Sequence, residues 1–223
     1  MDARLALAAE LEQQDRAVAQ RLEALAELAG AVAELRAGAE AVRAFHEALP
    51  GERAHLDEAE AEAIRGLEQA RAAVAAAQDA VARARGEDAR ETARRDEARA
   101  ASALRAAEER LERLRGRRSV LERQAEQREV EAVGLERRAG ELAAGLAASP
   151  RVSATAPPEP GLEGVLDWAS RAHAALLVAR GGLETERERI VREANELASS
   201  VLGEPLHSTS VALVRTRLEA ALR

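Results

Sequence analysis

The chain has 223 residues, of which 33% are charged and 1% aromatic, and it carries a net charge of −7 at pH 7. Aromatic side chains dominate the cores and ligand pockets of compact enzymes, so this composition argues against one. The absence of cysteine excludes disulfides and cysteine-ligated zinc, and the absence of lysine excludes an ordinary phosphate-binding loop and Schiff-base chemistry.

The abundance of Ala, Glu, Leu and Arg is typical of long helices and coiled coils. We therefore predict an all-α fold, an elongated antiparallel coiled coil in which helical hairpins fold back on one long central helix. The acidic net charge disfavours a dedicated nucleic-acid binder. No apolar run approaches the roughly 20 residues that span a bilayer, and no signal peptide is evident, so a cytoplasmic location is expected.

Residues 1–49 are predicted to form the first helix. Apolar residues recur every seven positions in two files offset by three or four residues, which is the pattern of a coiled-coil seam. The first file is Leu11, Val18, Leu25, Val32 and Ala39, and the second is Leu28, Leu35, Val42 and Leu49. Pro50-Gly51 is expected to end this helix and to form the turn of an antiparallel hairpin, because proline removes a backbone donor and glycine permits positive φ.

Residues 52–148 are predicted to form the long central helix, about 97 residues and roughly 145 Å at 1.5 Å per residue. Its first half has an alanine-rich seam. No large apolar residue occurs between Val81 and Leu104, and the seam resumes beyond this polar gap in a different phase. We interpret the gap as the place where two shorter helices meet end to end on the central one.

A proline-rich linker is predicted at 149–161 and a further helix at 162–203. One apolar file recurs at sevens along that helix: Leu162, Ala169, Leu176, Leu183, Ile190 and Leu197. A short helix should follow at 208–223, capped by Ser208 or Ser210. We expect 1–49 to pack on the first half of the central helix and 162–203 on its second half. A parallel homodimer remains the alternative, because heptads alone do not define orientation.

Three sets of residues are candidate sites. His46 and His55 are equidistant from Pro50-Gly51 and could face each other across a hairpin tip, but two histidines without a third ligand favour polar tip residues, and no metal or other cofactor is predicted. Trp168 either packs at the linker end of the helices or marks a partner surface, and packing is favoured.

An arginine cluster surrounds Gly116 and comprises Arg110, Arg113, Arg115, Arg117, Arg118 and Arg123. It could bind phosphates or an acidic partner. A solvated helix face paired with neighbouring glutamates is the favoured interpretation, because no aromatic side chain is interleaved for base stacking.

In its heptads and in the charged run at 186–197, the chain resembles the coiled-coil arms of SMC-type chromosome proteins, although it has none of their ATPase motifs. We expect a non-enzymatic structural or scaffold protein that mediates protein–protein assembly or self-association. One alternative is a nucleic-acid-binding, nucleoid-associated or SMC-arm-like protein that uses the arginine cluster. A second is a lipid-surface helical protein, which the acidic, nearly aromatic-free faces disfavour.

Overall fold

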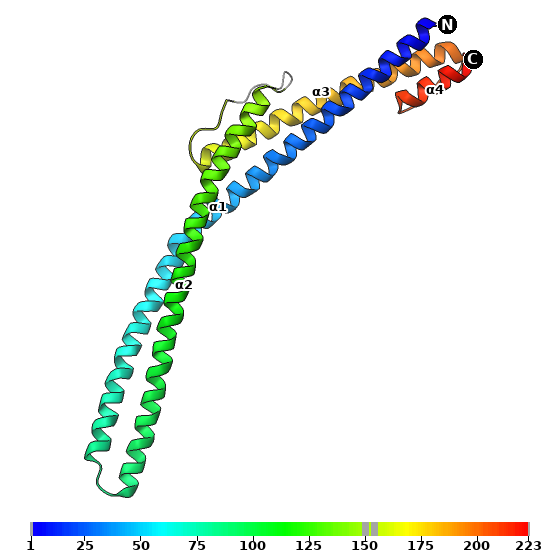
Figure 1. Cartoon of the computed structure of the whole chain (residues 1–223). Coiled ribbons are helices and arrows are strands. Elements are labelled where there is room, and N and C mark those ends of the chain that lie inside the picture. The colour runs from blue at the N-terminus through cyan, green and yellow to red at the C-terminus, as the bar shows by residue number, and fades with distance from the viewer. Residues whose placement is uncertain (1, 149–151, 153–155, 223) are drawn as a thin grey trace. The chain divides into compact units, whose positions relative to one another are not determined.

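The computed structural model describes residues 2–148, 152 and 156–222. Within them are four helices, α1 (Asp2–Arg83), α2 (Glu87–Ala147), α3 (Leu162–Leu202) and α4 (Val211–Ala221), and no strand, so the all-α prediction is confirmed (Figure 1). The chain divides into two compact units. Unit 1 comprises Met1–Glu40 and Ala132–Arg223, and unit 2 comprises Ala41–Glu131.

The predicted turn at Pro50-Gly51 is wrong, because α1 continues through both residues to Arg83. The bounds predicted for the first two helices, 1–49 and 52–148, are therefore wrong as well. The apolar file that contains Leu28 and Leu49 continues to Leu56 and on to Ala84 in steps of seven, and every member is buried or half-buried. An unbroken helix keeps this file on one face, and its burial offsets the cost of about 3 kcal/mol for an internal proline.

The chain turns instead at residues 84–86, where the polar gap begins. Gly86 adopts a φ of 92°, a left-handed conformation that glycine tolerates at little cost. Glu87 and Asp88 occupy the first turn of α2, where carboxylates favour the helix dipole, and the side chain of Arg90 donates to the carbonyl of Ala84 at 3.3 Å. The polar gap thus contains a hairpin turn and not a junction between two end-to-end helices.

Unit 2 consists of the C-terminal half of α1 and most of α2, which run in opposite directions (Figure 1). Ion pairs link Arg53 to Glu122 at 2.6 Å and Glu62 to Arg110 at 3.3 Å, so the partner number on α2 falls as the number on α1 rises. The buried core contains Ala63, Leu67 and Leu111, with Leu104, Ala107 and Leu114 packed against it. The first half of the predicted central helix therefore packs on residues of α2 and not on 1–49.

Unit 1 combines the start of α1 with the end of α2, α3 and α4. The predicted file from Leu11 to Ala39 is buried, as are Leu176, Leu183 and Ile190 of α3. Arg187 of α3 bonds Asp15 of α1 at 2.9 Å, which places this part of α3 on the start of α1 (Figure 1). The prediction that the helix at 162–203 packs on the second half of the central helix is therefore wrong for this stretch.

The ends of α3 and α4 agree with the sequence prediction more closely. Gly203, with a φ of 73°, caps the C-terminus of α3, and the side chain of Ser210 caps α4 by accepting a hydrogen bond from the Leu213 amide. Val211, Val214 and Leu218 form the buried stripe of α4. Of the predicted linker at 149–161, residues 149–151 and 153–155 lie outside the described residues.

Candidate functional site

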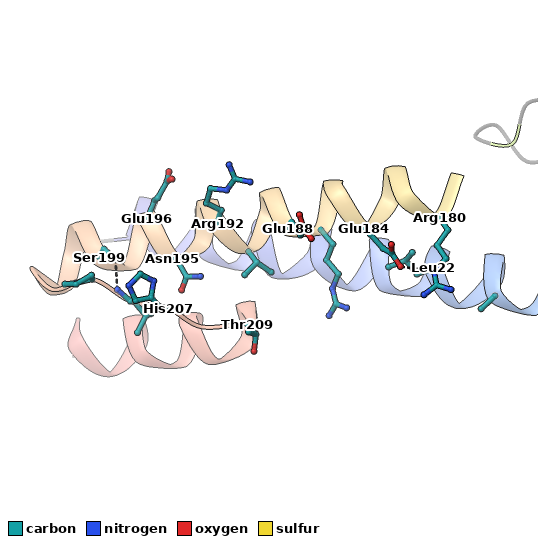
Figure 2. Close-up of a pocket in the computed structure, with 15 residues that line it drawn as sticks. Leu22, Arg180, Glu184, Glu188, Arg192, Asn195, Glu196, Ser199, His207 and Thr209 are labelled. Atoms are coloured by element: carbon teal, nitrogen blue, oxygen red, sulfur yellow. Dashed lines mark hydrogen bonds and ion pairs between the residues drawn. The ribbon is translucent and has the colours of Figure 1, made fainter. Parts of the chain in front are cut away.

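An open groove of about 1120 Å³ lies along α3 in unit 1. It is lined by Leu22 and Ala26 of α1, by one face of α3 from Arg180 to Ser199, and by the connection between α3 and α4 from Pro205 to Thr209 (Figure 2). Its apolar lining residues include Leu22, Val191 and Leu206, and its charged ones lie on α3.

The α3–α4 connection is fastened to α3 and forms one wall of the groove. The Asn195 side-chain amide donates to the Ser208 carbonyl at 2.8 Å, and the Ser208 amide donates back to Asn195 Oδ1 at 2.9 Å. The Leu206 amide donates to Ser199 Oγ at 2.9 Å, the bond drawn in Figure 2. These bonds satisfy backbone groups that no helix pairs, so the wall is held in place.

The short helix α4 lies beside one end of the groove (Figure 2). It packs on α3 through the buried residues Val211, Val214 and Leu218. Thr209, two residues before the first residue of α4, lines the groove, and Figure 2 shows it beside the first turn of that helix. The groove therefore runs along α3 both beside α4 and past its first turn.

The groove presents charges of both signs. Arg180 bonds Glu184 at 2.8 Å, and Arg187 is held by Asp15. Within the described part of the chain, Glu188, Arg192 and Glu196 line the groove without an ion-pair partner, and Figure 2 shows their side chains projecting from α3. Three arginines and three glutamates line the groove, so it offers no excess of positive charge to a polyanion.

A buried carboxylate ties α4 to α1. Glu12 is 7% exposed and accepts a hydrogen bond from Arg215 of α4 at 2.8 Å, with Arg16 on its other oxygen. The bond from Arg215, together with the positive charges of both arginines, lowers the pKa of Glu12, although burial acts in the opposite direction. The ionised form of Glu12 therefore stabilises the fold.

This linkage predicts a pH-dependent contribution to stability. Because the folded-state pKa of Glu12 is lowered, its contribution is present above the usual carboxyl pKa and is lost as the pH falls through the folded-state value. Glu12→Gln should lower the melting temperature at pH 7 by roughly 2–4 °C, for a loss of about 1 kcal/mol. In thermal melts from pH 7 to pH 3, the difference from the wild type should shrink towards the acidic end.

The control for this experiment is Glu23→Gln, which removes an equal charge from an exposed position of α1 without an ion pair in the described chain. It should leave the melting temperature nearly unchanged at every pH. A difference between Glu12→Gln and the wild type that is the same at pH 3 and pH 7 would contradict the linkage.

The six arginines around Gly116 lie on α2 in unit 2, and most contact acidic groups. Arg118 donates hydrogen bonds to Asp57 and to Glu60 of α1. The hydrogen bond to Asp57 is the largest cause that raises the pKa of Arg118 above its ordinary value, and the negative charges of both carboxylates add to it. Other contacts are Arg110 with Glu62, Arg113 with Glu109, Arg115 with Glu112, and Arg123 with the Ser119 carbonyl. Arg117 has no acidic partner in the described chain and borders a shallow pocket near His55.

The structure does not bring His46 and His55 together across a turn. Both lie on the continuous helix α1, nine residues and about 13.5 Å apart along its axis, so the predicted tip arrangement is wrong. Trp168 is completely buried in unit 1, and its indole nitrogen has no hydrogen-bond partner among the residues that the structure describes. Among the described residues no group of three or more His, Cys, Asp or Glu side chains could hold a metal ion.

Sequence reasoning missed the groove. Its wall depends on Asn195, the single asparagine of the chain, on Ser199 in the last turn of α3, and on Ser208 in the connection after α3. Polar side chains near a helix end that can bond a returning backbone were the available signal. Which backbone they bond depends on the path of the chain after Gly203, and the sequence pattern does not predict that path.

The fold and the groove thus define an all-helical protein with an open, mixed-charge surface groove. None of the described helices is long and apolar enough to cross a membrane. Comparison of the chain with protein-family models, with curated proteins and with solved structures finds no match.

Proposed function

We propose that the protein is a non-enzymatic structural or scaffold protein, built as an elongated antiparallel coiled coil, that mediates protein–protein assembly. The observation that carries this proposal is α1, a single helix of 82 residues that contributes to both compact units. A continuous helix of this kind is suited to holding two binding surfaces apart.

The pattern of burial supports the same proposal. The buried residues of α1 follow seven-residue files and pack against helices that run along it, which is how a coiled coil is stabilised. Large apolar side chains also remain outside the core, and Leu177 and Val178 of α3 are 53% and 78% exposed. Apolar positions of this kind are available to a protein partner.

The shape can be tested by small-angle X-ray scattering on the full chain. If α1 is straight throughout, it measures about 123 Å, and a rod of that length has a radius of gyration of roughly 35 Å. A globular chain of this size would have a radius of gyration of roughly 17 Å. A value near the globular one, at a scattering mass of one chain, would contradict the elongated arrangement.

The nucleic-acid alternative ranks second, since most of the arginine cluster contacts acidic groups within the chain. A titration with duplex DNA separates the two. Binding at low salt that weakens steeply as salt rises would favour the alternative, and the variant Arg117→Glu should then bind less tightly.

A further inference from the structure

The α1–α2 hairpin of unit 2 is built differently in its two halves. The proximal half, residues 53–67 of α1 and 104–122 of α2, holds the buried core around Leu67 and Leu111. Ion pairs between the two helices also lie in this half: Arg53 with Glu122, Arg110 with Glu62, and Arg118 with Asp57 and Glu60. Apolar burial and charge pairing therefore hold the two helices together here.

The distal half, residues 68–103, ends at the turn and has weaker contacts between its helices. The structure describes all of it, and none of its residues is buried. Val74 and Val81 are its only apolar side chains larger than alanine. Its ion pairs join residues of the same helix: Arg83 with Asp79, Arg95 with Glu91, and Arg99 with Asp96. Separating the two helices in this half therefore exposes little apolar area and breaks none of these pairs.

A carboxylate also occupies the seam of the distal half. Buried and half-buried residues of α2 recur in alternating steps of four and three, which is the spacing of a coiled-coil seam, at Ala93, Glu97, Ala100, Leu104, Ala107 and Leu111. By the register of the ion pairs, Glu97 faces the stretch of α1 between Arg71 and Arg83, which contains no basic residue. Within the described chain Glu97 has no ion-pair partner.

Arg118 shows how a charged seam position is accommodated in the proximal half. It lies three heptads further along α2 than Glu97 and is also half-buried, but Asp57 and Glu60 of α1 pair with it. A half-buried charge without such a partner loses hydration and gains no attraction in return. Glu97 therefore weakens the closed form of the distal half.

The turn determines how the distal half can open. Residues 84–86 are too few to let the two helices swing apart as rigid rods, so separation requires helical turns to unwind. Short helices in water owe most of their stability to the packing of their apolar face. Seam contacts and helical hydrogen bonds in this half are therefore lost together. Segments with few buried contacts are the ones that open locally while the rest of a protein stays folded.

We propose that the distal half of this hairpin is a separately opening segment, in which residues 68–103 unfold and refold as one unit while the proximal half stays closed. The boundary lies at Leu67 and Leu104, where the core of the proximal half begins. The opening requires only the hairpin of unit 2 and is independent of the scaffold function proposed above.

Native-state hydrogen exchange on the full chain, at low concentrations of urea, tests this opening. Amides of the distal half should exchange at least about 100-fold faster than those of the proximal half, yet more slowly than in an unstructured chain. They should share one dependence on urea, weaker than that of global unfolding, because only part of the surface is exposed. The exchange rates should change in a step at Leu67 and Leu104.

Variants at the seam should shift the opening in both directions. Glu97→Leu should slow exchange throughout the distal half about tenfold, because an apolar side chain replaces an unpaired carboxylate, and Val74→Ala should speed it. The matched control is Glu108→Leu, which makes the same change at an exposed position of α2 outside the seam. It should leave exchange in the distal half unchanged.

Three results would each overturn the proposal. One is equal protection of the two halves. Another is exchange that quickens gradually towards Gly86, as in simple fraying from the turn. The third is a Glu97→Leu protein whose distal half exchanges as fast as that of the wild type. None of them alters the radius of gyration expected for a rod, so the proposed scaffold function would stand or fall separately.

Discussion

Trp168→Ala is expected to lower the free energy of unfolding by about 3–5 kcal/mol, the usual cost of truncating a buried Phe or Trp side chain. The side chain of Trp168 is completely buried, as are the nearby residues Val165, Ala169 and Ala172 along α3. A close-packed interior does not collapse fully around a space as large as an indole ring, so a cavity remains in the variant. Urea unfolding followed by circular dichroism measures the loss.

Two further variants show whether the cost comes from volume. Trp168→Phe retains most of the apolar area and removes an indole N–H that has no partner within 2–148, 152 and 156–222, so it should cost much less than Trp168→Ala. Val178→Ala, at a position 78% exposed on the same helix, should change stability by no more than about 0.5 kcal/mol. A Trp168→Ala protein within about 1 kcal/mol of the wild type would show that the indole is not packed in the core.

Pro50→Ala should raise the free energy of unfolding by about 3 kcal/mol, an unusually large gain for one substitution. Pro50 lies inside α1, where it lacks the N–H of a helical hydrogen bond and its ring crowds the preceding turn. Gly51→Ala should add about 1 kcal/mol, because a Cβ at this position meets no atom within 4 Å and the φ of Gly51 is not positive. The same denaturation measurement reports both gains.

Gly86→Ala is the matched control, since it makes the same substitution at a real turn. Its φ of 92° is strained for alanine, so this variant should lose about 1–2 kcal/mol. The opposite signs at Gly51 and Gly86 distinguish a continuous α1 from a hairpin at Pro50-Gly51. A loss of stability in both Pro50→Ala and Gly51→Ala would show that the chain turns at residues 50–51 after all.

The contrast between Pro50 and Gly86 explains why the turn was misplaced in the sequence analysis. A proline followed by glycine is a strong local signal for a break, but the apolar file passes Leu49 and Leu56 without a change of phase. Across the polar gap the phase does change. Phase continuity reports which face of a helix is buried over many turns, and here it was the better guide.

Among the candidate sites too, periodic patterns were a better guide than local signals. The burial of Trp168 is the packing role that was favoured, while His46 and His55 were linked only through the misplaced turn. The groove depends on Asn195 and Ser199 bonding a chain that returns after Gly203. No periodic pattern contains that information.

Amino-acid composition and seven-residue periodicity were sufficient to predict an all-helical protein, the buried files from Leu11 to Ala39 and from Ala169 to Ile190, and the capped short helix at the end. Helix propensity and amphipathic spacing are properties of neighbouring residues, so they can be read along the chain. The helix partners, the position of the turn at Gly86 and the walls of the groove depend on contacts between residues far apart in the sequence. Several ways of pairing these helices would bury a similar apolar stripe. The free energies of the alternatives differ through the packing of side chains in three dimensions, which the sequence pattern does not contain.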